Sequence, residues 1–239
     1  MAKKGKIANK LTSPIALLTS AFRIFFARGN FIFLVTIAII NFLIVLPLGL
    51  ALGFLLFGKL GSVPNTDPFI YFDRIIANLP LFVFTMLMIA LFGAWTKTAT
   101  IIAIAGAAEG KQMKLIETYL QAFQRTLKYF LASLLLGIFT FIGGILLLVP
   151  GIVIYILFSF TLYIVVMTDV GVWASFKKSK NLVWPNFWGV TFRLGVFALF
   201  FLLINLIFGS VEYLGIVLLL FSAFYPLPTF LLYRELETA

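Results

Sequence analysis

The side chains that most enzymes use for catalysis are scarce in this chain. Its 239 residues include no histidine, no cysteine and only eight carboxylates. Without histidine there is no Ser-His-Asp triad and no imidazole base, and without cysteine there is no thiol nucleophile or thiolate metal site. None of the carboxylates falls in the middle of a long apolar segment, so the central acid of a proton-coupled transporter is missing too. We therefore expect no catalytic, cofactor or metal site.

Five polar side chains lie in or beside long apolar segments, and these are the candidate contacts for a ligand or an anionic lipid: Lys97, Arg193, Asp169, Asn41 and Asn205. For Lys97 and Arg193, the charged groups could reach the lipid headgroups from apolar stems. Alternatively, they could bind a phosphate or carboxylate inside a cavity that opens to the cytoplasm. Asn41 and Asn205 could form hydrogen bonds between helices or bind a substrate, and Asp169 could cap a helix and pair with a nearby lysine.

The composition indicates the surroundings in which these side chains must lie. Hydrophobic residues make up 63% of the chain and charged residues 11%, whereas roughly a quarter of the residues in a soluble domain are charged. A soluble domain of this size could not bury so much apolar surface, but a bilayer can solvate it. The apolar segments are about 20 residues long, as in membrane helices, and lack the alternation of barrel strands. We therefore predict a polytopic membrane protein built from helices.

Six apolar segments divide the chain. They lie near residues 31–57, 80–105, 129–148, 151–168, 188–209 and 213–233. We predict an all-α polytopic membrane helix bundle with six transmembrane helices and three cytoplasmic amphipathic helices. Residues 11–239 form a single membrane domain in this prediction, and residues 1–10 form a basic cytoplasmic tail.

The basic residues predict the orientation of the spans. With both termini in the cytoplasm, fourteen lysines and arginines of the tail and connections lie inside, and only Lys59 and Arg74 lie outside. This asymmetry is the positive-inside pattern expected of a multi-pass protein in a plasma or inner membrane. The formal net charge of +10 then indicates topology and contact with anionic lipid headgroups. As partners we expect the lipid bilayer and other membrane proteins, and no nucleic acid.

A short amphipathic helix, here called an elbow helix, is predicted before each pair of spans. In the first, Thr12 or Ser13 can cap the helix and Pro14 suits its first turn. The third covers about residues 169–184. The second is the clearest, because its apolar residues recur at spacings of three and four: Met113, Ile116, Leu120, Phe123 and Leu127. We expect each elbow helix to lie with its apolar face in the membrane surface.

The second half of the chain resembles a known family. The resemblance rests on Leu-Val-Pro-Gly-Ile at 148–152, Asp-Val-Gly at 169–171, Ser-Phe-Lys-Lys-Ser at 175–179, Asn-Phe-Trp at 186–188 and Leu-Tyr-Arg-Glu-Leu at 232–236. This order is similar to the membrane domain of membrane-anchored glycerophosphoryl diester phosphodiesterases and to related uncharacterised bacterial multi-span families. The span after the Pro-Gly turn lacks the arginine that members often carry. The resemblance implies the membrane architecture but not the phosphodiesterase reaction, which in that class belongs to a separate soluble domain with histidines.

Two functions from different classes fit these features. The first is a non-enzymatic scaffold linked to membrane lipid or envelope homeostasis through its elbow helices. The second is a small transporter or lipid-handling protein with an inward-facing cavity near Lys97 and Arg193. A bundle that packs solidly favours the scaffold, whereas a cavity lined by these two side chains favours transport.

Overall fold

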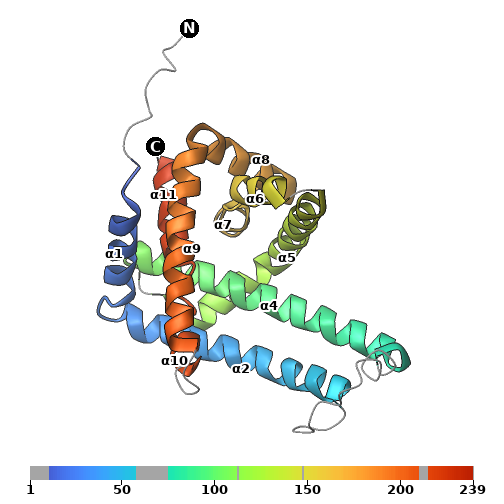
Figure 1. Cartoon of the computed structure of the whole chain (residues 1–239). Coiled ribbons are helices and arrows are strands. Elements are labelled where there is room, and N and C mark those ends of the chain that lie inside the picture. The colour runs from blue at the N-terminus through green and yellow to red at the C-terminus, as the bar shows by residue number, and fades with distance from the viewer. Residues whose placement is uncertain (1–10, 58–74, 112, 147, 210–214, 239) are drawn as a thin grey trace.

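The structure is a computed structural model that describes residues 11–57, 75–111, 113–146, 148–209 and 215–238, most of which are helical (Figure 1). The longer helices are α2 (Asn30–Phe57), α4 (Leu79–Ala108), α5 (Leu115–Leu146) and α9 (Phe187–Gly209). The shorter ones are α1 (Pro14–Phe25), α6 (Leu148–Leu157), α7 (Thr161–Met167), α8 (Val172–Val183), the 3-10 turn η1 (Trp184–Asn186), α10 (Gly215–Leu220) and α11 (Leu227–Thr238). No strand occurs in the described ranges, and the predicted all-α class is confirmed.

Five helical stretches of the described residues are long and apolar enough to cross a membrane. They are Asn30–Leu56, Leu79–Ala108, Leu115–Ile145, Val149–Met167 and Val172–Gly209. The sixth predicted span, at 213–233, is not one continuous helix, because turns at residues 221–226 separate α10 from α11. Pro226 accounts for the break, since proline has no N–H to donate and its ring clashes with the preceding turn. Pro228 is accommodated because it lies in the first turn of α11.

Helices occur at the three predicted elbow positions, but they join the next span in different ways. The first is a separate element. It is α1, which begins after Ser13, and the Ser13 hydroxyl accepts a 3.2 Å hydrogen bond from the amide of Ala16, as predicted for the cap. The second elbow continues into the third predicted span as the single helix α5. The third, α8, turns into α9 through η1, which contains Pro185. Their position at a membrane surface stays a prediction.

The apolar face of α1 packs against protein. Leu17, Leu18, Ala21 and Phe25 are buried, and the ring of Phe25 stacks on that of Phe221 at a centroid distance of 5.4 Å. Figure 1 shows α1 beside α9 and α11, both of which it contacts. The first elbow helix is therefore part of the bundle rather than a helix held by lipid alone.

The first half of α5 has the opposite arrangement. Its apolar side chains face away from the protein, with exposed fractions between 62% and 76%, at Ile116, Leu120, Phe123 and Leu127. On the same half-helix, Thr118 and Ala122 are fully buried against the bundle. An uncovered apolar stripe is the surface that an interfacial helix presents to lipid.

The α5–α6 hairpin is held by direct backbone contact. A Cβ atom built on Gly151 would lie 2.8 Å from the nitrogen of Gly144, and one built on Gly143 would lie 3.0 Å from the Cα of Gly151. Small residues at such crossings let two helices approach closely in a membrane, where van der Waals packing drives association. The two helices therefore touch through backbone at the Gly144–Gly151 crossing, and the side chain of Ile154 packs beside it against Gly143.

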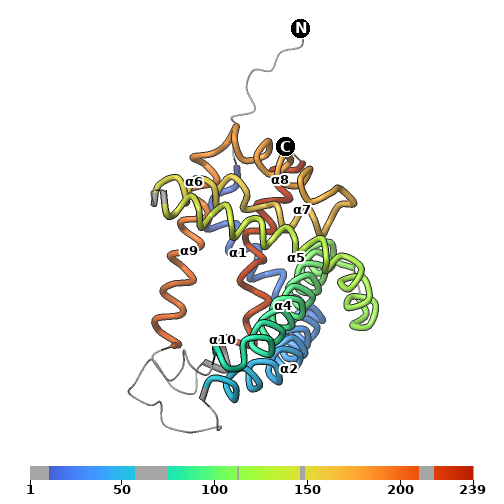
Figure 2. Tube along the Cα trace, turned by 90° about the vertical axis from the view of Figure 1, so that its right-hand side faces the viewer, coloured from blue at the N-terminus to red at the C-terminus, as the bar shows by residue number. Residues whose placement is uncertain are grey.

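The best-packed part of the bundle is where the second half of α4 meets α7 and α11. Ile164, Val165 and Val166 of α7 are completely buried there. Figure 1 and Figure 2 both show the Phe57 end of α2 next to the Leu79 end of α4, and Figure 1 shows the Gly209 end of α9 apart from them, beside α10. The cavity described next lies where α2, α4 and α9 face α5, α7 and α11.

Candidate binding cavity

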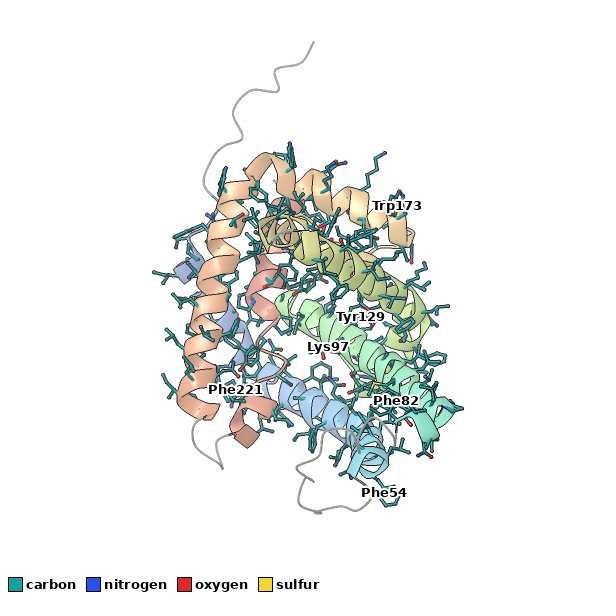
Figure 3. The ribbon with its side chains drawn as sticks, turned by 45° about the vertical axis from the view of Figure 1, so that its right-hand side comes forward. Phe54, Phe82, Lys97, Tyr129, Trp173 and Phe221 are labelled. Carbon is teal, nitrogen blue, oxygen red and sulfur yellow. The ribbon has the colours of Figure 1, made fainter. Side chains whose placement is uncertain are left out.

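A partly open cavity of about 800 Å³ lies within the bundle. Its lining comes from α2, α4, α5, α6, α7, α9, α10 and α11, and from the turns that contain Ser159 and residues 222–226. Figure 3 shows Lys97 and Tyr129 near the centre of the molecule, and both contribute to the lining. The volume falls within the range of roughly 300–1,000 Å³ that is typical of small-molecule sites.

Lys97 is the charged member of the described lining. It lies on α4 between Thr96 and Thr98, which are both buried, while its own side chain is exposed to the cavity. From the 1.5 Å rise per residue, Lys97 is roughly 16 Å from the Ala108 end of α4. Its four-carbon stem cannot bridge that distance along the helix, so the ammonium lies at the cavity rather than at this helix end.

No acidic residue of the described part of the chain balances Lys97. The ammonium forms no ion pair or hydrogen bond with a described residue, and the described part of the cavity lining contains no carboxylate. The described carboxylates lie elsewhere, at Glu109, Glu117, Asp169, Glu235 and Glu237. An ammonium in a largely apolar cavity is costly unless an anion accompanies it.

Four hydroxyl groups of the lining form no hydrogen bond with a described residue: those of Tyr129, Tyr155, Ser159 and Ser222. Tyr129 is only 8% exposed, and no described residue forms a hydrogen bond with its phenol. The Oγ of Ser159 is buried and equally without a partner. Leaving a buried polar group unpaired costs about 1–3 kcal/mol, so the Oγ of Ser159 favours a ligand or an ordered water as its partner. The phenol of Tyr129 offers a further hydrogen-bond donor.

Asn41 is tied into an interhelical network at the cavity wall. Its Oδ1 accepts a 2.8 Å hydrogen bond from the phenol of Tyr119, and its Nδ2 donates to the hydroxyl of Thr100 at 2.9 Å. The indole of Trp95 donates to the carbonyl of Tyr119 at 3.0 Å. Asn41 was expected either to form a hydrogen bond between helices or to bind a substrate. In the structure it forms hydrogen bonds between helices.

Asn205 and Tyr163 hold the turns that divide the sixth predicted span. The Nδ2 of Asn205 donates to the phenolic oxygen of Tyr225 at 3.2 Å, and the phenol of Tyr163 donates to the carbonyl of Pro226 at 3.1 Å. Tyr163, Tyr225 and Pro226 all line the cavity, whereas Asn205 does not. Asn205 thus contacts the cavity only through Tyr225.

Arg193 does not line the cavity; it anchors the start of the described chain. Its Nε donates to the carbonyl of Thr12 at 2.8 Å, one terminal nitrogen donates to Gly189 at 2.8 Å, and the other donates to Leu11. The carboxylate of Glu235 accepts further hydrogen bonds from the amide and hydroxyl of Thr12. Of the two cations, Lys97 lines the cavity and Arg193 does not.

Asp169 is exposed and takes neither role considered for it. The residue that caps α8 is Gly171, and Asp169 forms no ion pair with a described residue. Lys178, a lysine that could have paired with it, binds Glu237 at 2.8 Å instead. The backbone before α8 is extended at Gly171, and the acidic side chain lies outside the capping position.

An ion-pair network connects the C-terminal ends of α4 and α11 with the middle of α8. Arg234 binds Glu109 at 3.1 Å and lies 3.9 Å from Glu237, which Lys178 also binds. Burial raises the pKa of Glu237, but the hydrogen bond from Lys178 and the charges of Lys178 and Arg234 lower it. The net result is a pKa below the ordinary value of this carboxyl.

Sequence reasoning singled out Lys97 but missed Tyr129 and Ser159. Neither lies in a motif; Tyr129 directly follows the basic segment that ends at Lys128, and Ser159 lies within an apolar segment. The available signal was a hydroxyl at membrane depth, since such groups need a partner where water is absent. Comparison of the chain with protein-family models, with curated proteins and with solved structures found no match.

Proposed function

We propose that this chain is a multi-pass membrane protein that binds an anion in its central cavity, as a small transporter or lipid-handling protein. The observation that carries the proposal is the position of Lys97, a cation at a cavity of about 800 Å³ whose described lining has no carboxylate. A bound anion would supply the missing counter-charge in surroundings of low dielectric constant, where an unpaired ammonium is unfavourable.

The break between α10 and α11 supports the same proposal. Non-helical backbone at membrane depth is tolerated where protein buries it or where it lines a cavity, because each N–H and C=O still needs a partner. Discontinuous helices of this kind form the substrate sites of many secondary transporters. Here Ser222, Tyr225 and Pro226, which belong to the break, all line the cavity.

The second candidate, a non-enzymatic scaffold for lipid or envelope homeostasis, would require no cavity and no unpaired cation.

We also propose an orientation in the membrane. The excess of lysine and arginine in the connections assigned to the cytoplasm supports a plasma or inner membrane location with both termini inside. On this topology the exposed apolar stripe of α5 would lie in the cytoplasmic leaflet.

The test is transport in reconstituted vesicles. Purified parent protein, Lys97→Gln and Lys177→Gln are each placed in vesicles, and two rates are measured: uptake of inorganic phosphate, and transbilayer movement of a fluorescent anionic lipid. Lys177 is a matched control, because it is exposed on α8 and does not line the cavity.

We expect the parent and Lys177→Gln to accelerate one of the two processes over protein-free vesicles, and Lys97→Gln to lose that acceleration. A neutral-headgroup analogue of the fluorescent lipid should move no faster with protein than without it. If the parent accelerates neither phosphate nor anionic lipid, the transport proposal is wrong and the scaffold interpretation is favoured.

A further inference from the structure

We infer that the ligand of this cavity is an amphiphile with a single negative charge and an apolar chain. The inference rests on the proposed function and specifies its substrate class. Three features of the lining support it: one cation, a small set of unpaired hydroxyls, and an extended apolar wall.

The charge balance favours a singly charged ligand. Lys97 is the one ionised side chain of the described lining, and the remaining polar groups are neutral hydroxyls and the amide of Asn41. A carboxylate or a phosphodiester would be neutralised by this single ammonium. A doubly charged phosphomonoester would keep one uncompensated charge, which is unfavourable in a medium of low dielectric constant.

The hydroxyls restrict where the charged head can be bound. The hydroxyls of Thr96 and Thr100 already donate to backbone carbonyls of α4, at 3.0 Å and 2.9 Å, so they have no hydrogen to offer an anion. Four other hydroxyls of the lining form no hydrogen bond with a described residue, those of Tyr129, Tyr155, Ser159 and Ser222. A head bound by Lys97 could therefore also accept hydrogen bonds from hydroxyls of this set, of which Tyr129 is tested below.

The rest of the lining suits a hydrocarbon chain. Six of its apolar residues, from α2, α5, α7 and α9, are Val45, Leu136, Leu162, Leu194, Phe197 and Phe201. Water along such a wall would find few hydrogen-bond partners. An apolar chain would be transferred favourably from water in proportion to its buried area. A small hydrophilic anion would leave this surface without a contact.

The experiment compares ligands that share one chain length but differ in the head. They are a long-chain carboxylate, the matching alkyl phosphate and the matching alcohol, with inorganic phosphate as the chain-free anion. At pH 8 the alkyl phosphate is a dianion, because its second pKa is about 6. Dissociation constants are obtained from the concentration dependence of thermal unfolding in an uncharged detergent. The proteins are the parent, Lys97→Gln, Lys97→Arg, Tyr129→Phe and the control Lys177→Gln.

We expect the carboxylate to bind the parent, Lys97→Arg and Lys177→Gln with similar affinity. Lys97→Gln should weaken this binding about tenfold or more, and Tyr129→Phe should weaken it several-fold. The alcohol and inorganic phosphate should bind the parent at least tenfold more weakly than the carboxylate. The alkyl phosphate should bind several-fold more weakly than the carboxylate.

Three other outcomes would overturn the inference. Binding of the alkyl phosphate as tightly as the carboxylate contradicts the single charge, and equal binding of inorganic phosphate contradicts the apolar chain. Both of these results leave an anion site at Lys97 and hence the proposed function intact. Absence of any binding that depends on Lys97 overturns the inference and the proposed function together. Unliganded melting temperatures show whether each variant is folded.

Discussion

The phenol of Tyr119 donates a 2.8 Å hydrogen bond to the side-chain carbonyl of Asn41, and this bond joins the elbow half of α5 to α2. Asn41 passes the connection to Thr100 of α4. Asn41 and Thr100 face the cavity, whereas Tyr119 faces an outer groove with Trp95 and Phe123. The hydrogen-bonded side chains of Asn41, Thr100 and Tyr119 therefore separate the cavity from the outside of the bundle, and we call this network the polar wall.

Removing the amide should weaken this wall. Asn41→Leu deprives the Tyr119 phenol of its acceptor and Thr100 of a donor, and we expect a loss of about 1–2 kcal/mol in stability. Thermal unfolding in detergent measures the change. Asn205→Leu is the control, since Asn205 lies in an exposed part of α9 and should cost less. Equal losses for the two variants would contradict the structural role of Asn41.

The glycine contact of the α5–α6 hairpin gives a prediction with a closely matched control. Gly151→Ala places a methyl group 2.8 Å from the backbone nitrogen of Gly144, whereas a methyl group on Gly144 meets nothing within 4 Å. Because backbone cannot move aside as a side chain can, we expect Gly151→Ala to lose about 1–3 kcal/mol. Gly144→Ala should be neutral or slightly stabilising. The melting temperatures of the two variants test this difference.

The exposed stripe of α5 predicts a requirement for lipid contact. Phe123→Glu places a carboxylate in that stripe, where lipid would have to solvate it, so we expect poor membrane assembly. Gln124→Glu adds the same charge at an exposed polar position one residue away and should be tolerated. The amount of folded protein in membranes and its melting temperature provide the comparison. Identical values for both variants would show that lipid does not cover this stripe.

The ion pairs of Glu237 predict an acid-dependent loss of stability. Since its folded-state pKa lies below the ordinary value, this carboxylate stabilises the fold above its unfolded pKa, which is about 4.3. The stabilisation is lost as the pH falls through the folded-state value. Glu237→Gln should lower stability at neutral pH by about 1 kcal/mol or less. Its melting temperature should converge with that of the parent once the pH falls below the folded-state pKa of Glu237.

A matched control separates this effect from general acid sensitivity. Glu117 pairs with Lys114 at 3.3 Å, but both side chains are mostly exposed, so Glu117→Gln should leave the pH profile nearly unchanged. A parent profile that Glu237→Gln does not alter would mean that the Lys178 and Arg234 pairs contribute nothing measurable.

Cysteine labelling tests the proposed orientation, because the chain has no cysteine of its own. A membrane-impermeant thiol reagent should label Thr66→Cys in intact cells, and Lys177→Cys only after permeabilisation. Thr66 lies outside the described residues, and its side is predicted from the charge pattern alone. Lys177 is exposed on α8, whereas Ser179 two residues later is fully buried and would be a poor reporter. Labelling of Lys177→Cys from outside would contradict cytoplasmic termini.

Sequence alone was sufficient for the helical class and for five apolar stretches of spanning length, because bilayer thickness dictates how long such stretches must be. It did not reveal that the sixth is divided. Residues 213–233 are apolar throughout most of their length. A hydropathy average contains no information about which backbone carbonyl accepts a hydrogen bond, so it cannot locate a break in a helix. The contact of Tyr163 with Pro226 crosses 63 positions and leaves no local pattern.

The candidate site was only partly accessible to sequence reasoning for the same reason. Lys97 was recognisable as a cation inside an apolar segment. Whether its ammonium reaches the lipid headgroups or a cavity depends on which helices surround it, and these helices come from distant parts of the chain. Arg193 appeared equivalent to Lys97 by this criterion. Its guanidinium instead binds the carbonyls of Leu11 and Thr12, about 180 positions earlier, a partnership visible only in three dimensions.

The anchoring of Thr12 has a consequence for biogenesis. Thr12 is bonded both to Arg193 and to Glu235, and α1 also packs against α11. During synthesis, α1 emerges long before either partner exists. The part of the buried face of α1 that packs against α11 therefore stays uncovered until α11 has been made. A ribosome-arrested chain ending before residue 227 should therefore leave α1 accessible to protease, and release of the complete chain should protect it.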